Sequence, residues 1–319
     1  MLRLKTNVLS LLLGGIAAGL LLGSCSGLQK GADSGKPKVL ATSTILKNWT
    51  EEVAGDEVQV EGILDPGEDP HIYEPVPLDN QIIEDADLIL YNGYNLEPGL
   101  IKLIKSSASG ATFAVGEVIK PLDYDYKGRR EPDPHVWGDA ENAIAMVNAI
   151  RDQLIELSPE DKAKFIANAK KLTQSLQQVD GWVTQQIATI PDNKRQLVTT
   201  HDAFQYYAQA YSLKVAGTLI GISTEEQPSA QTVKKLSDDI RKLQVPAIFA
   251  ETTINPALIT TVAKEAKVKL SKRQLYSDSL GAPGSEADTY VKMLVANTKT
   301  IVEALGGRYQ AFPGAQVDS

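Results

Sequence analysis

Cysteine and histidine are scarce in this chain of 319 residues, which holds one Cys and three His. A single Cys excludes an intramolecular disulfide and any zinc site built on cysteines. Lys and Arg total 32 against 40 Asp and Glu, so the basic footprint of a nucleic-acid binder is also missing. Hydrophobic residues make up 43% of the chain, which excludes a disordered protein and allows a substantial core.

Several catalytic motifs are absent as well. The sequence has no Gly-x-Ser-x-Gly elbow, no phosphate-binding loop, no His-Glu-x-x-His and no Gly-x-Gly-x-x-Gly after a strand. These absences narrow the range of enzymes to consider. They leave the three histidines as the residues on which chemistry has to be sought.

The N-terminus has the pattern of a bacterial lipoprotein signal. A basic start at Arg3 and Lys5 precedes an uncharged run, which ends in small residues before Cys25 and resembles a lipobox. We expect cleavage of residues 1–24, a lipid on Cys25, and a flexible tether over residues 25–37. The alternative is an uncleaved membrane anchor with an incidental Cys. Both interpretations place the remaining chain outside the cytoplasm beside a membrane, in the periplasm or at the cell surface.

From Val39 onward, short apolar runs alternate with helical segments, which predicts an α/β fold with parallel sheets. In an N-terminal lobe spanning residues 38–157, we expect strands at 39–42, 58–64, 88–91 and 111–115. A C-terminal lobe spanning residues 191–311 repeats the scheme, with strands at 196–200, 214–220 and 247–250. This internal repetition predicts two similar lobes, each holding its own core.

Helical periodicity fills the region between the lobes, over residues 140–157 and again over 158–190. Ser158-Pro159-Glu160-Asp161 favours a helix start, with Pro in the first turn and acidic groups near the positive end of the helix dipole. We therefore expect residues 158–190 to form one long, stiff helix that links the lobes.

All three histidines follow predicted strands. His71 and His135 each come after Asp-Pro, whereas His201 comes directly after a predicted strand. Ligands of open α/β sheets bind outside the carboxyl ends of the strands, so these side chains are expected to face one crevice. Aligning the two lobes adds Asp278 from the corresponding C-terminal loop. Three imidazoles and one carboxylate suit a first-row divalent metal.

Other polar and aromatic residues near these loops have less specific interpretations. Glu251, which follows Phe249-Ala250, is a further candidate ligand, but we interpret it as an ion-pair partner behind the ligands. Trp137 and Tyr73 are expected to pack beside the loops. Each histidine taken alone has the ordinary alternative of a surface or core residue, and Asp278 that of a turn residue.

These segments resemble the metal-specific solute-binding lipoproteins of bacterial ABC importers, the zinc, manganese and iron binders once described as adhesins. The resemblance covers roughly residues 38–310. The matching segments are Ala41-Thr42-Ser43-Thr44, Pro66-Gly67-Glu68-Asp69-Pro70-His71-Ile72-Tyr73-Glu74-Pro75, Asn92-Gly93-Tyr94-Asn95-Leu96-Glu97, Asp133-Pro134-His135-Val136-Trp137, the segment around His201, and Tyr276-Ser277-Asp278-Ser279-Leu280-Gly281. The resemblance implies a metal between two α/β lobes bridged by one long helix, with His71, His135, His201 and Asp278 as its ligands.

The resemblance leaves the metal open. Manganese members of the family often carry Glu at the His201 position, whereas zinc members often carry His there together with a His-rich loop that this chain lacks. Imidazole nitrogen favours zinc, which also stands above manganese in the general affinity order. Binding through both oxygens of Asp278 would raise the coordination number to one that manganese accepts.

The expected function is therefore a monomeric binding protein, not an enzyme. It would capture zinc or manganese outside the cytoplasm and pass the ion to an ABC permease while a lipid anchors it to the membrane. One alternative is a zinc-dependent hydrolase that uses the three histidines with Asp278 or Glu251 as general base. Another is a surface adhesin or structural lipoprotein without tight metal binding.

Overall fold

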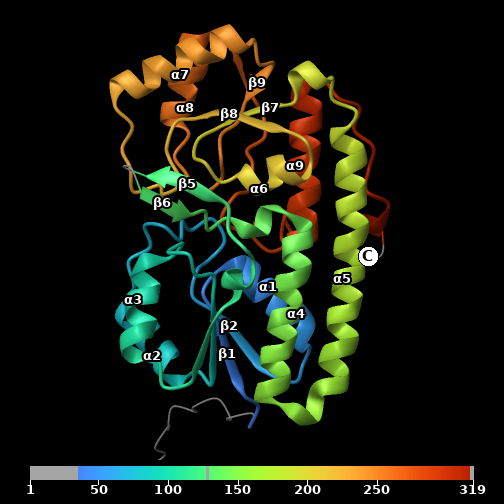
Figure 1. Ribbon diagram of the computed structural model, residues 1–319. Helices are drawn as coiled ribbons and strands as arrows, with labels where there is room; N and C mark the ends of the chain where they lie inside the picture. The colour runs from blue at the N-terminus through green and yellow to red at the C-terminus, as the bar shows by residue number, and fades with distance from the viewer. Residues whose placement is uncertain (1–34, 127–128, 317–319) are drawn as a thin grey trace, which may run out of the picture. The chain divides into compact units, whose positions relative to one another are not determined.

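A computed structural model describes residues 35–126 and 129–316 (Figure 1). The predicted signal sequence, Cys25 and most of the predicted tether lie outside the described residues. Within the described part of the chain, no helix combines the length and the apolar character needed to cross a membrane.

The N-terminal lobe is built on one parallel sheet with the strand order β2-β1-β3-β4. Its strands are β1 (Lys38–Ala41), β2 (Gln59–Gly62), β3 (Leu88–Tyr91) and β4 (Ala111–Ala114). The connections contain α1 (Thr44–Ala54), α2 (Pro77–Asp85), α3 (Pro98–Ser107) and the 3-10 turn η1 (Val115–Val118). These elements confirm the predicted parallel α/β unit.

Local sequence explains where these helices begin. Ser43 caps α1, because its hydroxyl accepts a hydrogen bond from the Leu46 N–H at 3.2 Å. Pro77 and Pro98 occupy the first positions of α2 and α3, where the missing N–H costs nothing. These residues fix where the connections after β1, β2 and β3 end and where the helices begin.

The C-terminal lobe repeats this design with shorter strands. Its elements are β7 (Gln196–Thr199), α6 (Gln205–Ala210), β8 (Lys214–Thr218), α7 (Ala230–Leu243), β9 (Ala247–Ile248), α8 (Ala257–Ala266), β10 (Lys269–Leu270) and α9 (Tyr290–Leu305), with a 3-10 turn η4 (Asp192–Lys194) before β7. β7 pairs in parallel with β8, and β9 with β10. A backbone hydrogen bond of 2.9 Å from Phe249 N to Val198 O joins the two pairs. The resulting order, β8-β7-β9-β10, matches that of the N-terminal lobe and confirms the predicted similarity.

Two long helices connect the lobes. The chain leaves α4 (Ala140–Leu157) through the 3-10 turn η3 (Pro159–Asp161) and enters α5 (Lys162–Ile187). The linking α-helix thus begins later than the predicted 158–190, because Ser158 donates to Asp161 across a separate tight turn at 2.8 Å. α5 packs against α1, α4 and α9, and in Figure 1 it runs beside both α4 and α9.

A small antiparallel hairpin was not anticipated from the sequence. It consists of β5 (Asp123–Tyr126) and β6 (Arg129–Pro132), and it precedes the 3-10 turn η2 (Val136–Gly138). The Tyr206 side chain of α6 ties the base of the hairpin to the C-terminal lobe. Its hydroxyl donates to Asp133 O and accepts from Leu122 N, both at 2.8 Å. The alternation Asp-Tyr-Asp-Tyr was the available signal for β5.

The expectation of a separate core for each lobe is only partly met. Each sheet has an apolar cluster of its own, around Ile89 in the N-terminal lobe and around Ile248 in the C-terminal lobe. The largest cluster, however, runs through both lobes along α1, α4, α5 and α9. In it, Tyr290 of α9 packs edge-on against Trp49 of α1, with ring centroids 4.8 Å apart.

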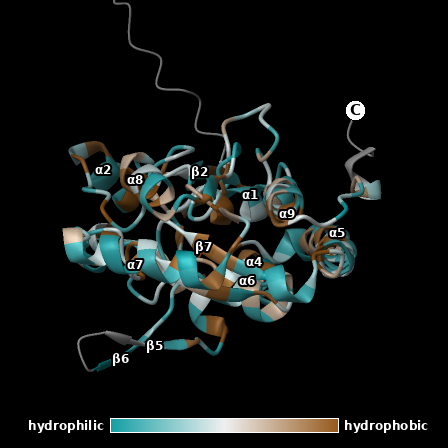
Figure 2. Ribbon diagram, turned by 90° about the horizontal axis from the view of Figure 1, so that it is seen from above, coloured by the Kyte–Doolittle hydropathy of each residue, from teal (hydrophilic) through white to brown (hydrophobic). Residues whose placement is uncertain are grey.

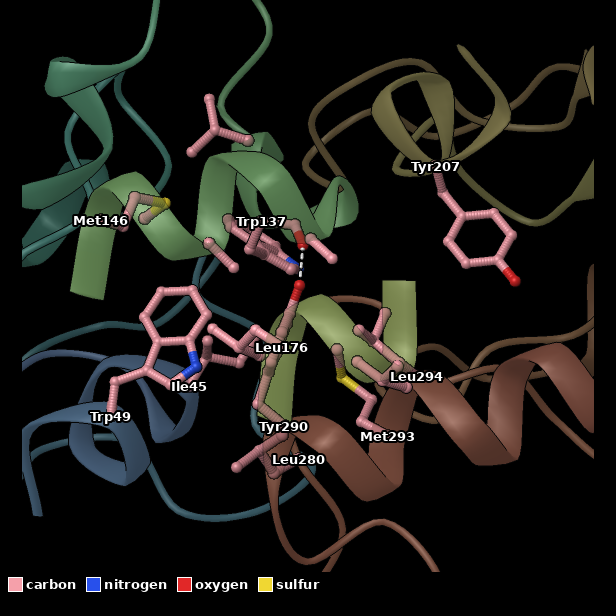
Figure 3. Packing of buried hydrophobic residues seen from close by; sticks show 14 of the residues in the cluster. Ile45, Trp49, Trp137, Met146, Leu176, Tyr207, Leu280, Tyr290, Met293 and Leu294 are labelled. Carbon is pink, nitrogen blue, oxygen red and sulfur yellow. Dashed lines mark hydrogen bonds between the residues drawn. The ribbon is translucent and has the colours of Figure 1, made fainter. Parts of the chain in front are cut away.

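Figure 3 shows how this shared core continues toward the inter-lobe loops. The Tyr290 hydroxyl donates a 2.5 Å hydrogen bond to the carbonyl oxygen of Trp137, which belongs to the N-terminal lobe.

Figure 2 shows hydrophilic residues on the outward surface of α7 and hydrophobic ones along β7. The shared core holds the loops of the two lobes in a defined relation, because close-packed interiors resist shear. The chain closes with the turn η5 (Pro313–Gln316).

Candidate metal centre

Four side chains from both lobes converge in one buried cluster, and they are the four predicted from the sequence. His71 lies in the loop after β2, His135 between β6 and η2, His201 after β7, and Asp278 in the loop before α9. Their potential ligand atoms all lie within 4.8 Å of one another, and all four residues are buried. The prediction that these loops meet at one place is thus met by the geometry.

Three separations between these atoms are close to those of a tetrahedral shell. His71 Nε2 lies 3.2 Å from His135 Nε2, and His135 Nε2 lies 3.3 Å from Asp278 Oδ1. His201 Nε2 lies 3.2 Å from Asp278 Oδ2. Zinc–nitrogen bonds of about 2.0–2.1 Å place tetrahedral ligand atoms roughly 3.3 Å apart. Since the Asp278 oxygens face different histidines, this carboxylate is oriented to bind through one oxygen or both.

The two Asp-Pro-His segments form the same local turn. In each, the Asp Oδ1 accepts a hydrogen bond from the backbone N–H of the histidine two residues later, at 3.0 Å for both His71 and His135. Pro has no N–H, so this Asx turn closes on the histidine itself. The repeated tripeptide therefore holds the two imidazoles by the same device.

Carboxylates lie behind two of the rings. His135 Nδ1 is 2.8 Å from Asp133 Oδ1, and His201 Nδ1 contacts Glu251 Oε2. Glu251 Oε1 also accepts from the His201 backbone N–H at 2.9 Å. Such partners hold the proton on Nδ1 and leave the Nε2 lone pair for a metal. Glu251 has the contacts expected of an ion-pair partner, whereas the role of Asp133 was missed, although the Asp-Pro-His motif contained it.

Two of the four groups have shifted pKa values that give them the protonation state of a metal ligand. Burial lowers the pKa of His71 to about 3, and the nearby imidazoles His135 and His201 act in the same direction. Burial opposes ionisation of Asp278, but the charge of His201 and hydrogen bonds from both histidines hold its pKa well below the usual value. His71 is thus a neutral base and Asp278 an anion, the forms that bind metal.

His135 behaves differently in the metal-free protein. Its burial disfavours the charged ring, but the hydrogen bonds and charges of Asp133 and Asp278 raise its pKa to about 9. A metal at this position would replace a proton, and its positive charge would satisfy the same carboxylates.

Further contacts close the site between the lobes. Trp137 Nε1 donates to Ser277 O at 3.0 Å, and its ring lies edge-on to His135 with centroids 5.4 Å apart. The predicted packing role of Trp137 is therefore met. On the Asp278 loop, Leu280 N donates to the Thr44 hydroxyl at 2.9 Å. Tyr73 packs over α2, where its hydroxyl donates to Asp79 at 3.0 Å.

Comparison with known proteins identifies the family of the chain. Residues 39–304 match the family described as "Zinc-uptake complex component A periplasmic". The chain belongs to this family. Its members are binding components of uptake systems and not enzymes, which gives no support to the hydrolase alternative.

Three similar proteins illustrate the range of the family. The manganese-binding lipoprotein MntA of Halalkalibacterium halodurans is 33% identical over 84% of this chain and 88% of its own length. The solved structure of the periplasmic zinc-binding protein TroA of Treponema pallidum has a TM-score of 0.81 at 33% identity, covering 86% of this chain and 100% of the TroA chain in that structure. A manganese-bound periplasmic metal-binding protein from Candidatus Liberibacter asiaticus has a TM-score of 0.76 at 28% identity, with coverages of 85% and 100%.

Proposed function

We propose that this protein captures a divalent transition metal, zinc or manganese, outside the cytoplasm and delivers it to the permease of an ABC importer. The observation that carries the proposal is the convergence of three imidazoles and one carboxylate from both lobes. Four protein ligands complete a shell and leave no position for a reacting water, which suits a carrier. The similar proteins MntA and TroA are named for manganese and zinc respectively, in keeping with a choice between these two metals.

In this proposal the metal is bound by His71, His135, His201 and Asp278, with Asp133 and Glu251 orienting two of the rings. The first three ligands supply Nε2, and Asp278 supplies one or both oxygens. The shared core and α5 limit how far the lobes can separate. Release would therefore depend on docking to the permease more than on a wide hinge motion. We keep 38–157, 158–190 and 191–311 as the boundaries of the two lobes and the linking segment.

The test compares Asp278→Ala with Asp192→Ala after purification without added metal. Asp192 has a side chain that is 92% exposed and pairs only with Arg195 among the described contacts, so it controls for loss of a charge. We expect metal in the parent and in Asp192→Ala and a strong loss in Asp278→Ala, measured by elemental analysis and by zinc and manganese titration. Equal metal content in the two variants would contradict the ligand assignment.

We further propose that the protein is a monomer held at the membrane by a lipid on Cys25. The lipobox pattern and the lipoprotein relatives support this anchor. Cys25→Ser should yield unprocessed or soluble protein, while metal binding by the purified domain stays at the parental level. Fractionation of cells measures the first outcome, with Ser26→Ala as the control. Equal membrane retention of Cys25→Ser and parent would contradict the anchor.

A further inference from the structure

A groove of about 520 Å³ reaches the metal centre from one side, and His71 is the member of the ligand set that forms part of its wall. The N-terminal lobe contributes Tyr94 to the wall, together with Arg129, Glu131, Pro132 and Pro134 of the hairpin region. The C-terminal lobe contributes Ile222, Ser223 and Glu225 from the loop after β8. The groove therefore lies between the lobes and ends at one particular ligand.

The three imidazole rings are not held equally, and the ring with the fewest contacts is His71, which lines the groove. Asp133 and Glu251 hold Nδ1 of His135 and His201, as described above. Among the residues that the structure describes, no hydrogen bond joins His71 Nδ1 to a protein group. The His71 ring is held through its backbone turn, so it can rotate at a lower cost than the other two.

One inter-lobe hydrogen bond stands at the edge of this groove. The Thr224 hydroxyl, in the same loop as Ser223, donates to Asp69 Oδ2 at 2.6 Å. The other oxygen of Asp69 accepts from the backbone N–H of His71. One carboxylate thus fastens the C-terminal loop and the His71 turn together, and both Asp69 and Thr224 are only 9% exposed.

We propose that the metal enters and leaves through this groove, with His71 as the last ligand to bind and the first to leave. The Thr224–Asp69 hydrogen bond is the latch that sets the exchange rate, because breaking it frees both the loop that lines the groove and the turn that holds His71. This proposal rests on the proposed metal-binding function. It assigns to Thr224 a kinetic role that does not require contact with the metal.

The first experiment measures metal transfer from the loaded full-length protein to a chromogenic chelator by stopped flow, with zinc and with manganese. Thr224→Val removes the hydroxyl at nearly constant volume and leaves all four ligands in place. We expect dissociation to accelerate about tenfold, the effect of losing one hydrogen bond to a charged group. Thr261→Val on α8 is the matched control, since among the described residues its hydroxyl bonds only to the carbonyl of Ala257 in its own helix, and it should exchange at the parental rate.

The second experiment narrows the groove instead of loosening it. Ser223→Trp places a large ring in the wall and should slow association and dissociation by a similar factor while leaving Kd unchanged. Slower rates with an unchanged Kd would show that Ser223 lies along the path of the metal and does not bind it, because replacing a ligand changes Kd. Parental rates in both Thr224→Val and Ser223→Trp, with metal still bound, would overturn the route and leave the function intact. Absence of metal binding in the parent would instead overturn the function.

Discussion

His201 is the residue at which metal preference is most open to change. Its Nε2 faces Asp278, and its Nδ1 and backbone N–H are both directed at Glu251. Nitrogen donors favour zinc, whereas manganese prefers oxygen. Because Glu251 holds the ring in place, a substitution of His201 mainly changes the type of donor atom offered to the metal.

We predict that His201→Glu lowers the ratio of zinc affinity to manganese affinity, even if zinc still binds more tightly than manganese. An anionic oxygen donor of similar reach replaces a neutral nitrogen and permits a larger shell. Competition titrations at fixed pH measure the ratio, since protons compete for the ligands. The introduced carboxylate would face Glu251, so His201→Glu combined with Glu251→Gln is the matched variant without that repulsion. An unchanged ratio in both would show that His201 does not set selectivity.

Glu97 is a buried acid outside the ligand set. It is 1% exposed, and its Oε1 accepts from Asn92 N at 2.7 Å and from the Thr42 hydroxyl at 2.9 Å. Burial raises its pKa to about 7, against the opposing effect of these hydrogen bonds. Below about pH 7 the folded protein therefore favours the protonated form of Glu97. Asn92 connects this acid to the His135 loop through a 3.0 Å hydrogen bond to Pro134 O.

A folded-state pKa above the unfolded value of an acid makes folding less favourable as pH rises. The contribution of Glu97 is complete below about pH 4.5 and is lost as pH rises to about 7, a loss on the order of 3 kcal/mol. Glu97→Gln keeps the acceptor and removes the ionisation, so its unfolding temperature should fall less than that of the parent between pH 5 and 8. Thermal melts of metal-free protein measure this, with exposed Glu84→Gln as control. Parallel curves for Glu97→Gln and the parent would refute it.

The helix α5 contains a glycine, Gly181, at a position where alanine would make the helix more stable. Gly181 lies on the exposed side of the helix, and an added Cβ there would meet no atom within 4 Å. Gly in a helix interior costs roughly 0.5–1 kcal/mol relative to Ala, because it loses more backbone entropy on folding. The helix that spans both lobes can therefore be made more stable without altering any contact.

We predict that Gly181→Ala raises the free energy of unfolding by about 0.5–1 kcal/mol and leaves metal affinity unchanged. Gly116→Ala is the contrasting variant, because its Cβ would lie 2.6 Å from Asn92 O and would force the backbone apart. Urea unfolding of the metal-free proteins should move the midpoint up for the first and down for the second. A destabilised Gly181→Ala would mean that the helix bends at this position or needs glycine there.

At the scale of the whole molecule, the shared core makes the lobes one thermodynamic unit. The largest apolar cluster includes residues of α1 and α4 from the N-terminal lobe, of β7 and α9 from the C-terminal lobe, and of α5 between them. Loss of packing in one lobe therefore removes contacts from the other. This coupling also keeps the candidate metal ligands of the two lobes within 4.8 Å of one another.

We predict that Leu176→Ala, at a fully buried position of α5, destabilises both lobes together by about 2–5 kcal/mol. Hydrogen exchange of β1 and of β7 should accelerate by similar factors, and calorimetry should show one transition. Ile166→Ala, on the same helix at a residue 43% exposed, should change stability much less. Faster exchange in one lobe alone would show that the lobes unfold independently.

The sequence was sufficient for many of the elements and for the convergence of the four candidate ligands. Apolar periodicity located β1, β3, β4 and α4 to within a residue, since each pattern reflects burial in a regular element. The repeat between the lobes pointed to Asp278, which no motif marks alone. The hairpin β5–β6 was missed because neither short strand carries an apolar run: β5 alternates acids with tyrosines, and β6 reads Arg-Arg-Glu-Pro.

Only the tertiary structure decided that Asp133 lies behind His135 and how the lobes are joined. The Asp133–His135 contact, the Thr224–Asp69 hydrogen bond and the core shared along α5 all depend on how loops and helices pack. Periodicity reports the burial of a side chain but not the identity of its neighbour across the chain. The sequence therefore determined what kinds of atoms could bind a metal, whereas packing between the lobes brought those atoms to within 4.8 Å of one another.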